Sequence, residues 1–362
     1  MNKKILIILL VGFFTFTSCQ EEISPKPPVS TSGNSGGDGD NAGGSDDDGG
    51  GDDDGSGGDG DDNGGSTGGA EGSYGDYCNQ DSLPAGTDAS HTVSSTYQNC
   101  FSVMDENTFD VVTWNIENFP VAGATTINHV EDIIKNLYAD VIAVQEIKSV
   151  SDFNTLLTKI RPYGYEGVIG NVHGSIELGY IYKKSEITAI SSLDLLYTED
   201  RDAFPRQPVL ATFTHKSGKQ FTLINIHLKA RDEGKERRKK ASAKLKSYID
   251  TNLPNASVII LGDFNDEIKE RFSGGDAFAN FVDDADDFHF ATSCVEEGSS
   301  ANFSYPFHSN PNYLSQIDHI LVTNELFSKL KTVETLRVDQ CLSNYENQVS
   351  DHRPVMARFL VD

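Results

Sequence analysis

The sequence predicts a layered α/β (α+β) fold with mixed β-sheets, and three observations support this prediction. From about residue 109, short apolar runs rich in β-branched and aromatic residues end in polar clusters, as buried strands do. Two longer stretches between these runs have helical patterns. Some neighbouring strands are separated by a helix and others by a short turn, which favours a layered sandwich over a strictly alternating barrel.

The predicted elements follow in chain order. Strands are expected at residues 111–116, 141–145, 180–182, 209–214, 221–228, 258–261, 317–322 and 355–361, and helices at 125–138 and 232–253. The strands at 209–214 and 221–228 flank Lys216-Ser217-Gly218-Lys219, a turn sequence that predicts a β-hairpin. The sequence contains no internal repeat.

The first 19 residues are typical of an export signal. Lys3 and Lys4 precede an apolar run at 5–16, which is shorter than the ~20 residues that span a bilayer. Residues 16–19, Phe-Thr-Ser-Cys, resemble a bacterial lipobox with Phe in place of the usual Leu, which implies lipidation at Cys19; a plain cleaved signal is the alternative. We therefore predict an exported protein, lipid-anchored in the cell envelope at the outer membrane or cell surface.

Residues 20–76 are predicted to form a disordered, acidic Gly/Asp/Ser-rich linker. Residues 31–72 contain no aromatic or branched apolar residue, so they cannot bury enough surface to offset their conformational entropy. A calcium-binding β-roll is disfavoured because its repeats need apolar residues to stack. Residues 1–76 carry 15 acids and three lysines, so 77–362 carry −14 of the total charge of −26. An acidic domain attracts polyanions only through local positive charge or metal ions.

Cysteine usage agrees with export. Besides Cys19 the chain has Cys78, Cys100, Cys294 and Cys341, an even number that is compatible with two disulfides. Local spacing favours Cys78–Cys100 and Cys294–Cys341, although three pairings are possible. A zinc site is disfavoured because no Cys-x-x-Cys pair is present.

Polar residues stand at the ends of five predicted strands, at positions where a buried core would favour apolar residues. They are Asn115, Gln145-Glu146, Asn225 with His227, Asp263 with Asn265, and Asp351-His352. One Asp at a strand end is more often a turn or cap residue. Five such sets are poorly explained by caps, and strand ends line the functional cleft of layered α/β folds.

These sets resemble the successive motifs of the endonuclease/exonuclease/phosphatase superfamily. The matching segments are Trp114-Asn115-Ile116, Gln145-Glu146, Asn225-Ile226-His227-Leu228, Gly262-Asp263-Phe264-Asn265, Gln316-Ile317-Asp318-His319 and Ser350-Asp351-His352-Arg353-Pro354. They occur in the order of that family and cover about 105–362, so we assign a catalytic domain to 105–362 and an N-terminal extension to 77–104. The resemblance implies a four-layer sandwich of two central β-sheets flanked by helices.

The resemblance also implies roles for individual residues. Glu146, with Asn115 and Asp351, would bind Mg²⁺ (or Mn²⁺), a hard cation that prefers oxygen ligands. His352, oriented by Asp318, would act with Asp263 to activate water, and Asn115 and Asn265 would bind the substrate phosphate. In the pancreatic-type deoxyribonuclease branch, His227 would be the leaving-group acid, Glu177 would steady it, and Arg206 would contact phosphate.

Three positions depart from that branch. Glu117 stands where the branch has an Arg that faces phosphate, Ser175 replaces a minor-groove Tyr, and Lys148 replaces another Arg. The basic run at 237–240 could form a nucleic-acid patch, but the solvated face of a helix is the favoured interpretation. These departures weigh against double-stranded DNA as the preferred substrate.

The leading hypothesis is a monomeric, metal-dependent nuclease that cleaves DNA or RNA outside the cell. The alternative is a phosphoesterase that acts on phospholipids, like a sphingomyelinase, or on inositol phosphates. For a lipid substrate, residues 303–307 (Phe-Ser-Tyr-Pro-Phe) are the one candidate for an exposed aromatic hairpin. A non-enzymatic surface adhesin is disfavoured because every expected catalytic position is filled.

Overall fold

The computed structural model describes residues 94–97, 100, 107–170, 176–269, 276–307, 310 and 314–362. The signal peptide with Cys19, the linker at 20–76, Cys78 and Ser175 lie outside these residues. No helix in the described part of the chain is long and apolar enough to cross a membrane.

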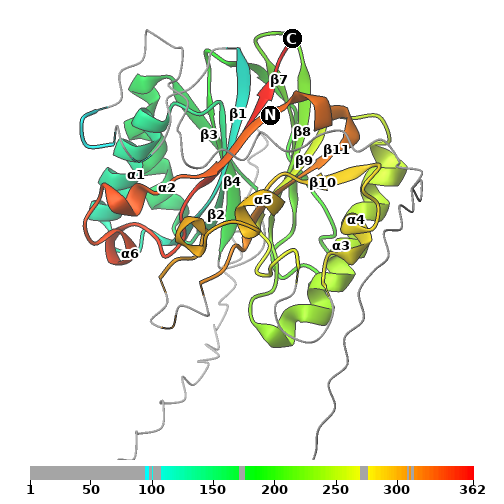
Figure 1. The fold of residues 1–362 in the computed structure, drawn as a ribbon. Helices are drawn as coiled ribbons and strands as arrows, with labels where there is room; N and C mark the ends of the chain where they lie inside the picture. Colours follow the sequence, from blue (N-terminus) through cyan, green and yellow to red (C-terminus); the bar gives the residue numbers. More distant parts are fainter. Residues whose placement is uncertain are drawn as a thin grey trace, which may run out of the picture. The chain divides into compact units, whose positions relative to one another are not determined.

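One β-sheet has six strands in the order β12-β13-β1-β2-β4-β3. The strands are β1 (Thr108–Phe119), β2 (Val141–Ile147), β3 (Tyr165–Gly170), β4 (Glu177–Lys183), β12 (Leu330–Thr335) and β13 (Val355–Leu360). Strands β1 and β2 are parallel, and all other pairs in this sheet are antiparallel. The two ends of the domain sequence therefore meet at the centre of the sheet, where β13 pairs with β1 (Figure 1).

The second sheet has seven strands in the order β10-β11-β9-β8-β7-β5, with β6 also paired to β7. They are β5 (Ile187–Ile190), β6 (Asp194–Leu195), β7 (Val209–His215), β8 (Gln220–His227), β9 (Val258–Asp263), β10 (Phe288–Phe290) and β11 (Asp318–Thr323). The hairpin β7–β8 is confirmed, and β8 is parallel to β9. Both sheets are thus mixed, as the connections in the sequence predict.

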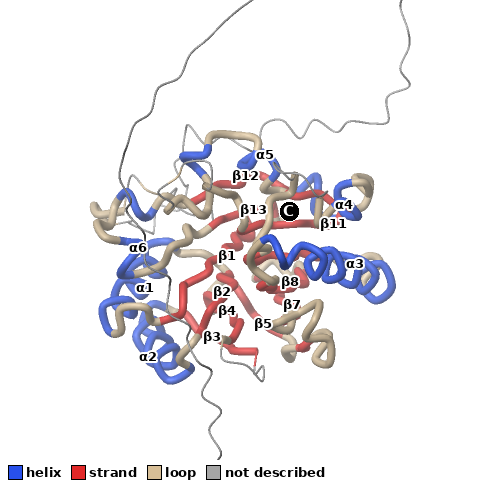
Figure 2. The backbone as a smooth tube through the Cα atoms, turned by 90° about the horizontal axis from the view of Figure 1, so that it is seen from below, coloured by secondary structure: helices blue, strands red, loops and turns tan. Residues whose placement is uncertain are grey.

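Helices cover the outer faces of the two sheets. The longer ones are α1 (Ala124–Leu137), α2 (Val150–Ile160) and α3 (Lys235–Asn252), and the short ones are α4 (Ala279–Val282), α5 (Ser293–Glu296) and α6 (Tyr345–Gln348). Short 3-10 turns lie at Arg161–Tyr163, Asp232–Gly234, Ser300–Asn302, Asn324–Lys329 and Val338–Gln340. Figure 2 shows α1, α2 and α6 on one side of the strands and α3 and α4 on the other.

Three apolar layers hold these elements together. The central layer joins the inner faces of the two sheets, for example Phe109 and Tyr180 of one sheet with Phe213 and Leu261 of the other. A second layer packs the first sheet against α1 and α2, and a third packs the second sheet against α3 and α4. Because burial of apolar surface drives this packing, the result is the expected four-layer sandwich, and that prediction is confirmed.

The predicted elements are present with shifted ends, and several short ones were missed. Helix α2 was not predicted, although Ser149 accepts a hydrogen bond from the backbone N–H of Asp152 and caps its first turn. Strand β3 contains Gly167 and Gly170, which weaken a strand signal. Strands β5, β6, β10 and β12 lie toward the sheet edges, where a short apolar pattern is hard to distinguish from a loop.

The disulfide pairing that local spacing favoured, Cys78 with Cys100 and Cys294 with Cys341, is wrong. Cys100 bonds Cys341 across 241 residues, and Cys294 is also disulfide-bonded. Cys100 and Cys341 belong to the apolar layer beneath α1 and α2, whereas Cys294 packs against the layer between the sheets. Cys294 and Cys341 are close in sequence but lie on different sides of a sheet, so sequence spacing could not identify the pairing.

Removal of this bond is expected to destabilise the domain. A cross-link over a long loop restricts the unfolded chain, so Cys100→Ser with Cys341→Ser should lower the free energy of unfolding by about 2–5 kcal/mol. Urea unfolding of the double variant and of the wild-type protein, both kept oxidised, would measure the difference. Equal unfolding midpoints would contradict the expectation.

Candidate active site

The predicted strand-end residues converge at one edge of the two sheets. Parallel strands bring their carboxyl ends to the same edge, so β1 with β2 and β8 with β9 deliver Asn115, Glu146, His227 and Asp263 together. Antiparallel strand β11 begins at this edge, where its first residue, Asp318, pairs with Asp263. The cluster therefore follows from strand direction.

Gly262 allows the close approach of β8 and β9 at this edge. Its φ angle is 153°, and a Cβ atom at this position would collide with the carbonyl oxygen of Ile226. A larger residue would push the strands apart. The glycine of the Gly-Asp-Phe-Asn segment thus places Asp263 beside His227, with which it is paired in register.

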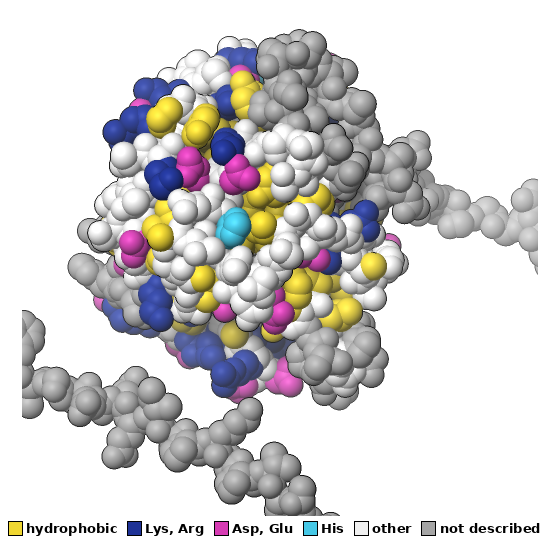
Figure 3. Space-filling model, turned by 90° about the vertical axis from the view of Figure 1, so that its left-hand side faces the viewer, with side chains coloured by type: hydrophobic (Ala, Val, Ile, Leu, Met, Phe, Trp, Pro, Cys, Tyr) yellow, Lys and Arg dark blue, Asp and Glu magenta, His cyan; other side chains and the backbone are white. Residues whose placement is uncertain are grey.

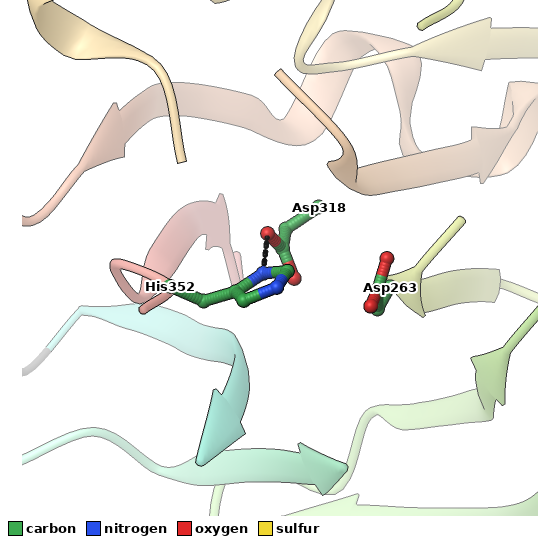
Figure 4. Close-up of side chains that lie close together, drawn as sticks. All are labelled: Asp263, Asp318 and His352. Atoms are coloured by element: carbon green, nitrogen blue, oxygen red, sulfur yellow. Dashed lines mark hydrogen bonds and ion pairs between the residues drawn. The ribbon is translucent and has the colours of Figure 1, made fainter. Parts of the chain in front are cut away.

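Asp318 and His352 form a buried, hydrogen-bonded pair. Oδ2 of Asp318 lies 2.7 Å from Nδ1 of His352, and Asp263 stands opposite the pair (Figure 4). Burial acts to lower the pKa of His352, but Asp318, Asp263 and Asp351 oppose it, and the resulting pKa is well above the usual value. His352 is therefore an imidazolium at neutral pH.

Asp263 is a buried carboxylate with a raised pKa. Burial raises its pKa to about 7, while the charge of His352 acts in the opposite direction. Its Oδ2 accepts a hydrogen bond from Nδ2 of Asn115 at 3.1 Å, and its Oδ1 accepts one from the backbone N–H of Asn265 at 2.9 Å. A buried carboxylate with a pKa near 7 is suited to take a proton from water.

Glu146 lies on the first sheet, across from this pair. It has a left-handed φ of 64° at an irregularity in the pairing of β2 and β4, and this turn sets its carboxylate at the strand end. Its Oε1 is 3.2 Å from Nδ2 of Asn115, and its Oε2 accepts a hydrogen bond from the backbone N–H of Asn118. The Glu146 carboxylate is thus pre-positioned by β1.

Glu117 and Asp351 add two carboxylates beside Glu146. Oε2 of Glu117 accepts a hydrogen bond from the backbone N–H of Asp351 at 3.1 Å. Burial, followed by repulsion from Asp351 and Glu146, raises the pKa of Glu117 to about 7. Burial is also the main cause of the raised pKa of Asp351, to which Glu146 adds. Carboxylates that repel one another in this way are suited to a divalent cation.

A second group of possible metal ligands consists of Asp263, Asp318 and His352. One ligand atom from each lies within 4.8 Å of the others. However, Asp318 and His352 already bond each other, and a cation here would compete with the imidazolium. Glu146 and Asp351, the metal ligands predicted from the sequence, do not belong to this group.

His227 is placed in the site but differs electrostatically from His352. Its Nε2 lies 3.4 Å from Oδ2 of Asp263 and 3.8 Å from Oε1 of Glu146. Burial, then the charges of Arg206 and His352, hold its pKa well below the usual value, so His227 is neutral at pH 7. The predicted role of His227 as leaving-group acid stays a prediction.

Glu177 does not hydrogen-bond to His227 in this structure. Nδ1 of His227 is buried without a hydrogen-bond partner, and Glu177 at the start of β4 pairs in register with Ile147. The predicted steadying contact is therefore absent from the described residues. The charge of Arg206 is near enough to lower the pKa of His227, and Arg206 makes no ion pair with the described part of the chain.

Asn265 binds Asp263 through its backbone, whereas its side chain bonds to the end of β8. Its φ is 54°, its backbone N–H binds Asp263, and its Nδ2 donates to the carbonyl oxygen of Leu228 at 3.3 Å. Asn265 thus joins the ends of β8 and β9, and its amide borders the site.

The hydrogen bonds that hold the catalytic residues in place were not predicted from the sequence. The hydroxyl of Tyr345 accepts a hydrogen bond from Nε1 of Trp114 and donates one to the carbonyl oxygen of His352. Oγ of Ser350 donates to the carbonyl oxygen of Asn115. Trp114 is buried, and its N–H takes part in this chain of hydrogen bonds. A buried Trp or Tyr needs a polar partner, yet the sequence does not reveal which one.

A buried amide network joins the two sheets beneath the site. Nε2 of Gln145 on β2 donates to Oδ1 of Asn225 on β8 at 2.8 Å. Nδ2 of Asn225 donates to the carbonyl oxygens of Val144 and Gly179, and its backbone N–H donates to the hydroxyl of Tyr180. Gln145 and Asn225 therefore set the spacing of the sheets instead of contacting substrate.

The basic run at 237–240 is an ordinary helix face. Arg238 is buried and binds Asp266, Lys239 pairs with Glu236, and Lys240 pairs with Asp202. The face over α1 and α2 likewise carries both charge signs (Figure 3), including pairs such as Lys159 with Glu131. Lys148 is exposed. No broad cationic surface is found on these two faces.

Comparisons with known proteins agree with this architecture. Residues 112–352 match the model of the Endonuclease/Exonuclease/phosphatase family. Humanized D. rerio TDP2 is 16% identical with a TM-score of 0.55, and the match covers 70% of this chain and 99% of that one. The endonuclease/exonuclease/phosphatase from Bacteroides vulgatus is 19% identical with a TM-score of 0.53, covering 69% and 98%.

A third structure is the 3′ phosphatase NExo from Neisseria, bound to a product DNA hairpin. It is 18% identical with a TM-score of 0.52, and the match covers 69% of this chain and 99% of that one. At such identities the likeness of structures concerns the fold alone. Among curated proteins, no sequence matches this chain.

Proposed function

Because the chain belongs to the endonuclease/exonuclease/phosphatase family, we propose that it is a divalent-metal-dependent hydrolase that cleaves phosphodiester bonds of nucleic acid. Members of this family are metal-dependent phosphoesterases. The proposal rests on one observation: Asp263 lies beside the buried Asp318–His352 pair, and the carboxylates of Glu117, Glu146 and Asp351 lie next to them. Such a site would supply a base, a fixed positive charge and carboxylates that could hold a metal ion.

Asp263 is the proposed base. It is held by Asn115 and by the backbone of Asn265, so its free lone pairs point in a fixed direction. With a pKa of about 7, it is partly ionised at neutral pH and can accept the proton of the attacking water. Hydroxide then adds to phosphorus as the bond to the leaving oxygen breaks.

His352 is proposed to stabilise the charge of the transition state. Asp318 fixes the ring through Nδ1, while Nε2 lies 3.8 Å from Oδ1 of Asp351, beyond hydrogen-bond distance, so that its N–H could face the phosphate. Its raised pKa keeps the ring cationic, so it can donate a hydrogen bond to a phosphate oxygen. This role differs from the activation of water together with Asp263, which the resemblance of the motifs implied for His352.

Glu146 and Asp351, with Asn115 nearby, would hold Mg²⁺ or Mn²⁺. When bound, the cation supplies positive charge to the non-bridging phosphate oxygens and so favours attack. Arg206 adds a fixed positive charge at the same edge, where it has no ion-pair partner among the described residues. These local charges would offset the net charge of −14 at 77–362.

The alternative substrates, phospholipids and inositol phosphates, are less well supported. A lipase that acts on membranes would be expected to present an exposed aromatic hairpin, for which residues 303–307 were the candidate. Phe303 is only 5% exposed, and the ring of Phe307 packs on Tyr345. These rings are thus used in packing, which favours a nucleic-acid substrate.

Export and lipid anchoring at Cys19 remain part of the proposal and rest on residues 1–19. The acidic segment at 20–76 would then separate the enzyme from the membrane. Fractionation of cells that express wild-type protein or Cys19→Ser would test the anchor, because loss of the lipid should release the protein from the membrane fraction. Equal membrane association of both proteins would contradict it.

A substrate panel tests the activity. Purified full-length protein with Mg²⁺ or Mn²⁺ should cleave single-stranded DNA, plasmid DNA or RNA, and EDTA should stop the reaction. His352→Ala serves as the matched inactive control. Turnover of sphingomyelin or inositol phosphates, with no cleavage of nucleic acid, would overturn the nuclease proposal.

A further inference from the structure

An aromatic side chain that the catalytic proposal does not use lies against the catalytic histidine. The ring centroid of Tyr305 is 5.3 Å from that of His352, and the two planes are tilted by 57°. Unlike its neighbour Phe303, Tyr305 is only half-buried. Part of the Tyr305 ring therefore remains available to a ligand beside the catalytic imidazole.

The backbone of Tyr305 is tied to both members of the catalytic pair. Tyr305 forms a two-way backbone bridge with Ser315, and Oγ of the preceding Ser304 accepts a hydrogen bond from the backbone N–H of Asp318. The carbonyl oxygen of Ser304 accepts one from the backbone N–H of Arg353, next to His352. This anchoring fixes the ring relative to the reacting phosphate.

The hydroxyl group of Tyr305 is not used by the protein. It makes no hydrogen bond with the described part of the chain, although Asp351, Glu117 and Asp263 are close enough to act on it electrostatically. A buried Tyr usually satisfies its hydroxyl group with a protein partner, as Tyr345 does here. Tyr305, in contrast, is only half-buried, and its ring contacts His352 without a hydrogen bond from its hydroxyl group to the described residues.

We propose that Tyr305 is a specificity-determining residue that stacks an unpaired nucleobase next to the scissile phosphate, so that the enzyme prefers single-stranded nucleic acid. The proposal rests on the nuclease function proposed above. A phosphate bound at His352 would place the nucleoside attached to it beside Tyr305, because the phosphoester linkage between phosphate and nucleoside is short. Bases of a duplex are stacked on one another, whereas unpaired bases can turn outward onto an aromatic ring.

The charges around the site support the same preference. Duplex binding depends strongly on many contacts between cations and phosphates. Here Glu117 adds a carboxylate beside Asp351, and Lys239 and Lys240 of helix α3 are paired with acids. Stacking on Tyr305 offers binding energy that needs no broad cationic surface.

The test compares three substrates of one sequence with full-length wild-type protein, Tyr305→Ala and Tyr305→Phe. The substrates are a single-stranded oligonucleotide, the same strand in a duplex, and a single strand with abasic residues flanking the cleaved linkage. Wild-type protein should prefer the base-bearing single strand. Tyr305→Ala should reduce its kcat/KM about 5- to 150-fold, mainly through KM, as stacking of 1–3 kcal/mol implies.

The controls separate stacking from support of His352. Tyr305→Phe should retain most of the activity, and the abasic strand should be cleaved equally by all three proteins. A binding measurement without catalysis uses 2-aminopurine in the single strand with EDTA present: wild-type protein and Tyr305→Phe should alter its fluorescence, and Tyr305→Ala should not. Thermal unfolding checks that each variant is folded, and Tyr305→Leu replaces Tyr305→Ala if the latter does not fold.

Three outcomes would overturn the proposal. First, Tyr305→Ala could lower kcat equally on abasic and base-bearing strands, which would indicate that Tyr305 only supports His352. Second, wild-type protein could cleave the duplex faster than the single strand. Third, the 2-aminopurine signal could be the same for wild-type protein and Tyr305→Ala. Failure of the nuclease proposal itself is distinguishable, because wild-type protein would then cleave none of the three substrates.

Discussion

Asp318→Asn is expected to lower kcat about 10⁴-fold while the protein remains folded. The amide has nearly the same shape, but it cannot carry the charge that faces Nδ1 of His352, so the ring loses its fixed orientation and its stabilised positive charge. Asp318 is fully buried and His352 is only 6% exposed, so water offers little compensation for the lost charge. Steady-state cleavage of an oligonucleotide would measure the loss.

The pH profile gives a second readout of this pair. Asp318 is one of the groups that raise the pKa of His352, so its removal should lower that pKa. If cationic His352 is needed, activity falls as pH rises through its pKa, and Asp318→Asn should move this alkaline limb to lower pH. Asp318→Asn combined with His352→Ala should lose little more than either single variant, because the two side chains act as a unit. Additive losses would contradict the pairing.

Glu146→Gln is expected to abolish the stabilisation of the protein by Mg²⁺ or Mn²⁺ and to lower kcat by about 10³-fold or more. The cation contributes several kcal/mol to charge neutralisation, and Glu146 is the carboxylate that Asn115 and the backbone of Asn118 hold in place for it. At a metal concentration 100 times the Kd, wild-type protein should gain about 2.7 kcal/mol of stability. Thermal unfolding with and without metal would detect this gain independently of activity.

Glu166→Gln is the matched control for Glu146→Gln. Glu166 pairs with Lys184 on the molecular surface and belongs to β3, away from the clustered carboxylates. Its replacement should leave both the metal-dependent stabilisation and the activity unchanged. If Glu146→Gln were stabilised by metal as strongly as wild-type protein, the metal would have to bind elsewhere, for example at Asp263, Asp318 and His352.

Most of the site could be predicted because its residues interrupt local patterns. Asn115, Glu146 and Asp263 are polar residues at the ends of strands that are otherwise apolar, and such positions meet at one edge whenever parallel strands share a sheet. The fold class followed from the same strands and their connections. These features are encoded within a few residues of each position.

Electrostatic roles were harder to predict than positions. The motifs do not distinguish His227 from His352 by charge, yet His352 is cationic because three carboxylates surround it, and His227 is neutral because burial is reinforced by Arg206. Glu117 was interpreted as a loss of phosphate binding. In the structure it also joins the carboxylates around Glu146 and binds the backbone of Asp351.

The sequence by itself determined the layered α/β class, most of the strands and the polar residues at their ends, since periodicity and strand ends are local properties; the four-layer arrangement was implied by the resemblance of the motifs to a known family. Only the tertiary structure decided that Cys100 bonds Cys341, that Tyr345 supports His352, and that Tyr305 borders the catalytic ring. These contacts join segments far apart in the chain. Their partners, and the pKa values that depend on them, are set by burial and packing that no local pattern contains.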